Sequence, residues 1–274
     1  MWKGIFKSFR DKKRSGTMHG QDDMTLSIGI TTFENRFEKY FVPLLTRIRE
    51  YDDDTEIIVT INGEHKQEFG EEYRAGILDF ISRKKKVFPI VFPRFRSPSK
   101  MWNTIVVHAT HDYVLILNDD IMITNPNFMD DIKKAIKRND GRSFIINSSF
   151  SHYLICRREL AEIGYFDERL LGIGEEDGDI TWRYIHQYGR QLKAVSIRGF
   201  VNMSEQTMNH VPLNIKSRPG TKYSLFNRQF IYETKYERNP SGIKGMFDHP
   251  MIIKDQGPQQ YPHENFYREN RDKL

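Results

Sequence analysis

Acidic side chains are concentrated in one stretch of the chain, residues 164–188. Asp167 and Glu168 come before a turn that contains Gly172 and Gly174. Four more acids follow this turn, where an amphipathic helical pattern begins: Glu175, Glu176, Asp177 and Asp179. Free N–H groups and the macrodipole favour acids at a helix N-terminus, but capping needs only one or two of them. The stretch therefore indicates a general base with supporting carboxylates, and a solvated charged face is the alternative.

A second acidic group follows a short apolar run. In the run 112–117, Asp112 is followed by five apolar residues, a pattern that is typical of a buried strand in a parallel sheet. The run ends at Asn118, Asp119 and Asp120. Carboxylates at the carboxyl end of a central parallel strand point into the crevice where open α/β sheets bind ligands. Their hard oxygens suit Mg²⁺ or Mn²⁺ bridging a diphosphate, and a simple Asn/Asp turn is the alternative.

Along the chain, Asn118-Asp119-Asp120 comes first and the acids of residues 164–188 follow roughly 50 residues later. This succession resembles the motifs of the inverting family 2 glycosyltransferases of the GT-A fold. The later group reads Gly-x-Phe-Asp-Glu-x-Leu from residue 164 and Gly-Glu-Glu-Asp-x-Asp from residue 174. The segment 26–36 is similar to the family's first strand and its Thr-Tyr-Asn-Arg-type turn, with one extra residue. The resemblance covers about residues 25–236. It implies an α/β fold, a single GT-A type Rossmann-like domain with a mostly parallel central sheet flanked by helices.

The resemblance also implies roles for individual residues. Asp120 is expected to bind the metal, Mn²⁺ or Mg²⁺, and His210 to be a further metal or phosphate contact. Contacts with the donor are expected from Thr31, Thr32, Asn62, Lys100, Asn103, Asn118 and Asp119. Asn62 follows the second predicted strand, where relatives commonly carry an acid near the donor base, and Glu64 is the other residue that could substitute for it.

The expected reaction moves a sugar from a nucleotide-sugar donor, UDP-linked, to a hydroxyl of a glycan or lipid-linked acceptor. The metal would act as a Lewis acid on the leaving nucleoside diphosphate. Asp177 is the predicted base that takes the acceptor proton, and in-line attack would invert the anomeric centre. Glu176 and Asp179 would orient the acceptor or hold the helix start. These roles correspond to polysaccharide biosynthesis.

Strand and helix patterns alternate through the first half of the chain, which favours a parallel sheet with right-handed crossovers. A helix over 37–48 should kink or restart at Pro43, because proline lacks the N–H that a helix interior needs. Further strands are expected at 56–61, 87–92 and 192–197, and further helices at 68–83, around 102–109 and at 223–236. The predicted organisation is a basic N-terminal segment and tether (1–22), the glycosyltransferase domain (23–238) and a polar tail (239–274).

The N-terminus carries an amphipathic pattern of its own. Trp2, Ile5, Phe6 and Phe9 recur at helical spacing, and basic residues surround them up to Arg14. Such a helix can lie in a headgroup layer, where cations are drawn to anionic lipid, so residues 2–14 are predicted to bind an anionic membrane surface. Docking on the protein's own core or on a second subunit is the alternative.

Composition narrows the remaining function classes. The net charge is +5, and no recognisable nucleic-acid motif accompanies it, so nucleic acid is not an expected partner. No stretch approaches 18 apolar residues, and the single Cys156 is consistent with a reducing compartment. The prediction is a cytoplasmic protein that the N-terminal helix would attach peripherally to the cytoplasmic face of a membrane. A nucleotidyltransferase and a non-catalytic nucleotide-sugar-binding domain are the alternative functions.

Overall fold

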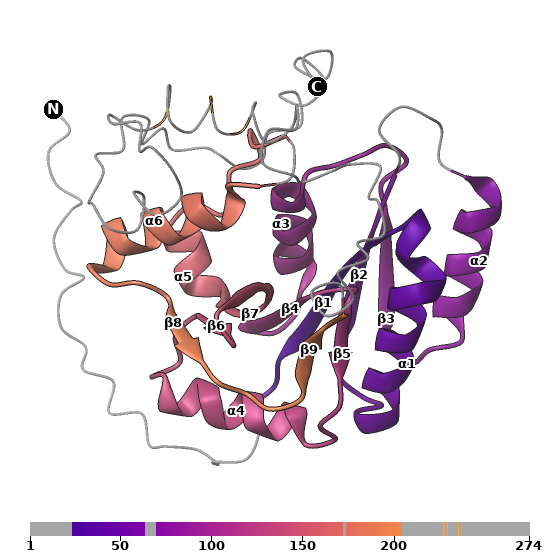
Figure 1. The fold of residues 1–274 in the computed structure, drawn as a ribbon, viewed down its shortest axis with the longest axis horizontal. Helices are drawn as coiled ribbons and strands as arrows, with labels where there is room; N and C mark the ends of the chain where they lie inside the picture. Colours follow the sequence, from indigo (N-terminus) through magenta and orange to yellow (C-terminus); the bar gives the residue numbers. More distant parts are fainter. Residues whose placement is uncertain are drawn as a thin grey trace, which may run out of the picture.

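A central sheet lies between two layers of helices (Figure 1). The computed structural model of the protein describes residues 24–63, 70–171 and 174–203, together with Asn227, Gln229 and Lys235. Within these residues the predicted α/β class is confirmed. The predicted N-terminal helix, His210 and the predicted tail lie outside the described residues.

Seven strands form the central sheet in the order β3-β2-β1-β4-β7-β6-β8. They are β1 Ser27–Phe33, β2 Ile57–Asn62, β3 Val87–Val91, β4 Tyr113–Asn118, β6 Phe144–Ile146, β7 Ser149–Cys156 and β8 Lys193–Val195. Strand β1 is parallel to both β2 and β4, β2 is parallel to β3, and β6 is parallel to β8. Within the central sheet, as far as the structure describes it, only β7 runs against its neighbours, β4 and β6. The sheet is therefore mostly parallel, as predicted.

The chain leaves the central sheet after Asp119 and Asp120. Strand β5, Ile121–Ile123, pairs antiparallel with β9, Phe200–Asn202, in a separate two-stranded sheet. Asp119 and Asp120 form the turn between β4 and β5. The acids therefore lie where the chain steps from one sheet to the other.

Eight helical segments connect and cover the described strands. They are η1 Glu34–Arg36, η2 Phe37–Phe41, α1 Val42–Tyr51, α2 Glu71–Ser82, α3 Pro98–His108, α4 Phe128–Arg138, α5 Arg157–Glu162 and α6 Glu176–Tyr188. The predicted helix over 37–48 changes at Pro43, because a wide turn of π-helix ends at Phe41 and α1 begins with Pro43 in its first turn. None of the described helices is long and apolar enough to cross a bilayer.

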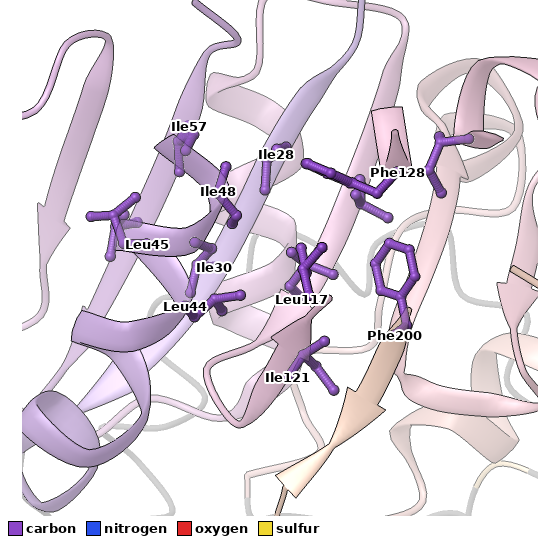
Figure 2. Packing of buried hydrophobic residues seen from close by; sticks show 14 of the residues in the cluster. Ile28, Ile30, Leu44, Leu45, Ile48, Ile57, Leu117, Ile121, Phe128 and Phe200 are labelled. Atoms are coloured by element: carbon purple, nitrogen blue, oxygen red, sulfur yellow. The ribbon is translucent and has the colours of Figure 1, made fainter. Parts of the chain in front are cut away.

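Strand residues alternate between two hydrophobic clusters, one on each face of the sheet. Ile28 and Ile30 of β1 pack with α1, α2 and α4, together with Leu115 and Leu117 of β4. Figure 2 shows part of this cluster, in which Phe200 of β9 also packs. The opposite face packs against α3, α5 and α6, where Val114 and Ile116 of β4 point. This period of two is the expected consequence of strand geometry when both faces are covered.

Helix α3 approaches β1 very closely at Gly29. A Cβ atom built on Gly29 would lie 2.3 Å from Cγ2 of Ile105 on α3, closer than atoms can pack. Glycine at this position therefore lets α3 lie directly on the sheet. The contact fixes the start of α3, and with it Lys100 and Asn103, near the carboxyl edge of the sheet.

Candidate functional site

A buried arginine spans the Asp119 and Asp120 pair. Arg36 Nε lies 2.6 Å from Asp119 Oδ1, and Arg36 Nη2 lies 2.6 Å from Asp120 Oδ2. The Arg36 guanidinium lies 4.7 Å from the centroid of the Tyr40 ring and 5.4 Å from that of Phe33. All three charged groups are buried, so the ion pairs are shielded from water. Burial raises the pKa of Asp119 to about 6, although Arg36 opposes this rise.

Each of the two carboxylates keeps one oxygen available. Asp119 Oδ2 and Asp120 Oδ1 are buried and have no hydrogen-bond partner among the described residues. Buried polar atoms are normally satisfied, so these two oxygens fit a bound cation. The described residues contain no group of three or more acidic, histidine or cysteine side chains arranged to hold a metal ion. Asp119 and Asp120 thus provide two candidate ligands, and His210, the predicted further ligand, lies outside the described residues.

His152 borders the same acidic pair from β7. Its ring stacks on Phe200, with centroids 5.6 Å apart and planes 3° from parallel, and its Nε2 has no hydrogen-bond partner in the described part of the chain. Burial lowers the pKa of His152 to about 4, although the charge of Asp120 opposes this. His152 is therefore a neutral ring at neutral pH.

Helix α6 begins with a strained turn, which sets the direction of the acidic side chains in the first turn of the helix. Gly174 has φ 111° and Glu175 has φ 77°, a left-handed conformation that costs energy for a residue other than glycine. Glu176 is the first helical residue, and the Gly174 N–H donates a 2.7 Å hydrogen bond to its Oε2. The turn therefore fixes the direction in which the acids of α6 leave the backbone.

Glu176 is buried, and its second oxygen, Oε1, has no hydrogen-bond partner among the described residues. Burial raises the pKa of Glu176 to about 8. Burial also raises the pKa of Tyr153 well above 10, and the charges of Glu176 and Asp177 add to that rise. Glu176 consequently keeps its proton near neutral pH and can donate a hydrogen bond there.

Asp177 differs from the other acids around it because its side chain reaches solvent. Glu175, Glu176 and Asp179 are all buried, whereas Asp177 is exposed. Its Oδ1 accepts a 2.9 Å hydrogen bond from the Gly178 N–H. The protein around Asp177 removes part of its hydration and raises its pKa. Of the predicted catalytic acids that the structure describes, Asp177 is the one that an incoming molecule can reach.

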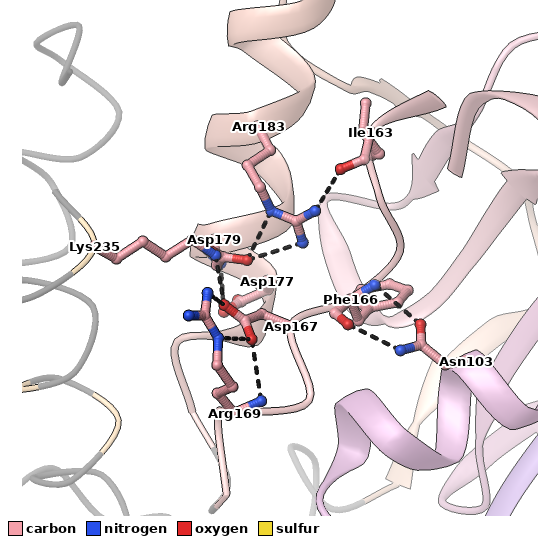
Figure 3. A network of polar contacts seen from close by, with 10 residues as sticks. Asn103, Ile163, Phe166, Asp167, Arg169, Asp177, Asp179, Arg183 and Lys235 are labelled. Carbon is pink, nitrogen blue, oxygen red and sulfur yellow. Dashed lines mark hydrogen bonds and ion pairs between the residues drawn. The ribbon is translucent and has the colours of Figure 1, made fainter. Parts of the chain in front are cut away.

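Asp179 belongs to a buried ionic network behind the first turn of α6 (Figure 3). Asp179 pairs with Arg183, 2.9 Å away, and with Lys235. Lys235 Nζ also lies 2.8 Å from Asp167 Oδ2, and Arg169 binds the same carboxylate at 2.9 Å. Lys235 and Arg169 hold the pKa of Asp167 below its usual range, against the opposing effect of burial. Of the two roles expected for Asp179, these contacts fit the one at the helix start.

Asn103 is engaged within the protein rather than facing an open site. It is fully buried, its Nδ2 donates to Phe166 O at 2.8 Å, and its Oδ1 accepts from the Phe166 N–H (Figure 3). The same Nδ2 also lies 3.0 Å from Glu168 Oε1, to which it donates. Both ends of the amide are in use within the protein, where they hold the backbone at Phe166, and the expected contact with the donor stays a prediction. Lys100, one turn earlier, lies 3.3 Å from Glu168 Oε2.

Asn62 has a similar role at the end of β2. Its Nδ2 donates to Arg96 O at 2.8 Å, and its Oδ1 accepts from the Arg96 N–H at 2.7 Å. Asn62 is also buried. The amide holds the loop before α3, and the predicted contact with the donor base stays a prediction. Glu64, the other candidate, lies outside the described residues.

The remaining predicted donor residues lie at the carboxyl ends of neighbouring strands. Thr31 of β1 pairs in register with Asn118 of β4, next to the two acids. Thr32 is buried, whereas Thr31 and Asn118 are partly exposed. The structure therefore brings Thr31, Asn118 and the Asp119–Asp120 turn together at one edge of the sheet.

Strand β7 links the two acidic groups. His152 and Tyr153 are adjacent on β7 and pair with Leu117 and Ile116 near the end of β4. Successive strand residues point to opposite faces, so His152 faces Asp120 while Tyr153 faces the start of α6. The two acidic groups thus flank the same end of β4 from opposite faces of the sheet.

Sequence reasoning missed Arg36 and His152 as site residues. Arg36 is the last residue of the segment that is similar to the family's first strand. The available signal was that two adjacent acids, Asp119 and Asp120, need a positive charge nearby when they are buried. His152 lies in a strand that no strong pattern marked, and nothing in the sequence indicated its contact with Phe200.

No protein-family model matches the chain, and no curated protein matches it in sequence. In structure the chain is similar to TarS from S. aureus, with 17% identity and a TM-score of 0.50 over 65% of this chain and 36% of that chain. The TarS 1-349 fragment in complex with UDP gives 16% identity and a TM-score of 0.51 over 65% of this chain and 59% of the fragment. This chain therefore spans less than two thirds of either. At these identities the similarity shows the fold, which is that of the GT-A glycosyltransferases.

Proposed function

We propose that the chain is a metal-dependent inverting glycosyltransferase that moves a sugar from a nucleotide-sugar donor to a hydroxyl of a glycan or lipid-linked acceptor. The observation that carries the proposal is that the two acidic groups flank the end of β4 in a GT-A fold, and that Asp177 alone is exposed among the acids of residues 167–179 that the structure describes. A UDP-linked donor is proposed because the similar TarS 1-349 fragment has been solved in complex with UDP.

The donor side of the proposal rests on Asp119 and Asp120. Their two unpartnered oxygens would hold Mn²⁺ or Mg²⁺, with His210 as a further ligand. A divalent cation bound there would supply positive charge to the leaving diphosphate. Thr31, Thr32 and Asn118 border these acids and would contact the donor. Lys100 would contact a phosphate from the start of α3, close to its partner Glu168.

The acceptor side rests on Asp177. Its exposed carboxylate would take the proton from the acceptor hydroxyl while that oxygen forms a bond to the anomeric carbon. The bond from the anomeric carbon to the diphosphate breaks at the same time, and the diphosphate leaves with the electron pair. Attack from the face opposite the leaving group inverts the anomeric centre. Glu176 does not fit the role of base, because its raised pKa keeps it protonated near neutral pH.

Asp177→Asn tests the assignment of the base. The change keeps the size of the side chain but removes its ability to accept a proton, so turnover should fall by about 10² to 10⁴ while donor binding is retained. Turnover would be measured by release of nucleoside diphosphate from a panel of nucleotide sugars with Mn²⁺.

Asp130→Asn is the matched control, because Asp130 is also an exposed acid in the first turn of a helix, α4. Equal turnover in both variants would move the base to another residue. Binding of nucleoside triphosphates in preference to diphosphates would support the nucleotidyltransferase alternative, and diphosphate binding without turnover would support a non-catalytic binding domain.

A further inference from the structure

The guanidinium of Arg36 already supplies a positive charge to the carboxylates that would hold a metal. It contacts one oxygen of Asp119 and one of Asp120, each at 2.6 Å, and leaves the other oxygen of each buried and without a hydrogen-bond partner in the described residues. The side chain of Arg36 is 8% exposed, so water screens its charge poorly.

The surroundings of Arg36 hold it firmly in this position. Its guanidinium contacts the ring of Phe33 at the end of β1 and the ring of Tyr40 on η2. A turn that had no other role would not need these four contacts, because Asn and Asp side chains stabilise turns by hydrogen bonds to the backbone alone. Without Arg36, two adjacent buried carboxylates would repel each other and lack any described counter-charge.

We propose that Arg36 is the resident counter-ion of the Asp119–Asp120 pair and that its charge weakens the binding of a divalent cation to these acids. This inference rests on the metal role assigned above to the two acids. A cation that binds the free oxygens of Asp119 and Asp120 must approach Arg36 or displace it. Either course costs free energy, because like charges a few ångströms apart repel and because displacement breaks two buried ion pairs.

The experiment is a titration of the full chain with MnCl₂, in the absence of any nucleotide or sugar, with free Mn²⁺ followed by electron paramagnetic resonance. Arg36→Gln should bind Mn²⁺ about tenfold more tightly or better than the unaltered protein, since even weak repulsion at this separation corresponds to that factor. The gain should disappear when Asp120→Asn is added to Arg36→Gln, which locates the tighter site at the acid pair.

Two further variants separate charge from structure. Arg47→Gln is the matched control, because Arg47 is also ion-paired and stacked on a tyrosine, Tyr51, but lies on the surface of α1. It should leave the affinity for Mn²⁺ unchanged. Arg36→Lys keeps the positive charge and should bind Mn²⁺ far more weakly than Arg36→Gln.

Equal or weaker binding of Mn²⁺ by Arg36→Gln, or no measurable binding by either protein, overturns the inference. If Arg36→Gln does not fold by itself, thermal unfolding with and without Mn²⁺ decides: recovery of a folding transition on adding Mn²⁺ supports the inference, and no recovery overturns it. The outcome is independent of sugar transfer, because the titration contains no donor or acceptor. A failure of the proposed function would appear only in the turnover assay.

Discussion

Glu176→Gln should change how the stability of the protein depends on pH. Burial raises the pKa of Glu176 from 4.5 to about 8 in the folded chain. A group whose pKa is raised on folding contributes stability that is complete below its unfolded pKa and is lost as the pH rises through its folded pKa. The free energy of unfolding should therefore decrease as the pH rises from about 4.5 to about 8.

The size of this effect follows from the same two values. The interval spans roughly 3.5 pH units, and about 1.4 kcal/mol per unit gives an upper limit of roughly 5 kcal/mol between its ends. Glutamine has the shape of the protonated acid and can still accept from the Gly174 N–H, which binds Glu176 Oε2 at 2.7 Å. Glu176→Gln should therefore match the unaltered protein near pH 5 and exceed its stability at pH 8 by a few kcal/mol.

Urea unfolding of both proteins at pH 5, 6.5 and 8 measures the difference directly. Glu72→Gln is the matched control, because Glu72 is an exposed glutamate in the first turn of α2. If Glu176→Gln and the unaltered protein lose stability in parallel from pH 5 to pH 8, Glu176 is ionised in the folded chain. The argument that it cannot serve as the base would then fail.

Three other expectations follow from the proposed roles. Asp120→Ala should abolish turnover and weaken diphosphate binding in a chain that still folds, although the change breaks the buried ion pair with Arg36. Full activity in EDTA would contradict the metal role. Lys235→Met should lower the free energy of unfolding, measured in urea, by roughly 3–5 kcal/mol, because it leaves Asp167 and Asp179 buried with less positive charge nearby. Unchanged stability would show that Arg169 and Arg183 are enough to balance the two carboxylates. The unaltered protein should co-sediment with anionic liposomes in a salt-sensitive way, whereas a chain starting near Asp22 should stay in the supernatant. If both stay in the supernatant, the predicted helix at residues 2–14 packs on the protein's own core or on a second subunit.

Short-range patterns in the sequence were sufficient for most of the first half of the fold. The strands predicted at 56–61 and 87–92 appear as β2 and β3, and the predicted change of helix at Pro43 is confirmed. These features depend on the period of buried side chains and on the missing N–H of proline, which are properties of neighbouring residues. The reversal of β7 could not be read in this way, because a strand has the same period in either direction.

The acidic groups could be recognised in the sequence, but which acid is buried and which is exposed could not. Glu176 and Asp177 are adjacent and chemically alike, and only packing against the rest of the chain buries the first and exposes the second. Asn62 and Asn103 appeared equally suited to bind a ligand, yet both are used to hold loops.

Arg36 illustrates the same limit most clearly. It lies 83 positions before Asp119 in the chain, and the parallel pairing of β1 with β4 brings the two together. The residue types at the site were therefore fixed by the sequence alone. Which of them pair, which keep a proton and which reach solvent was decided by the tertiary structure, because the charge of each group depends on neighbours that are distant along the chain and on the water that they exclude.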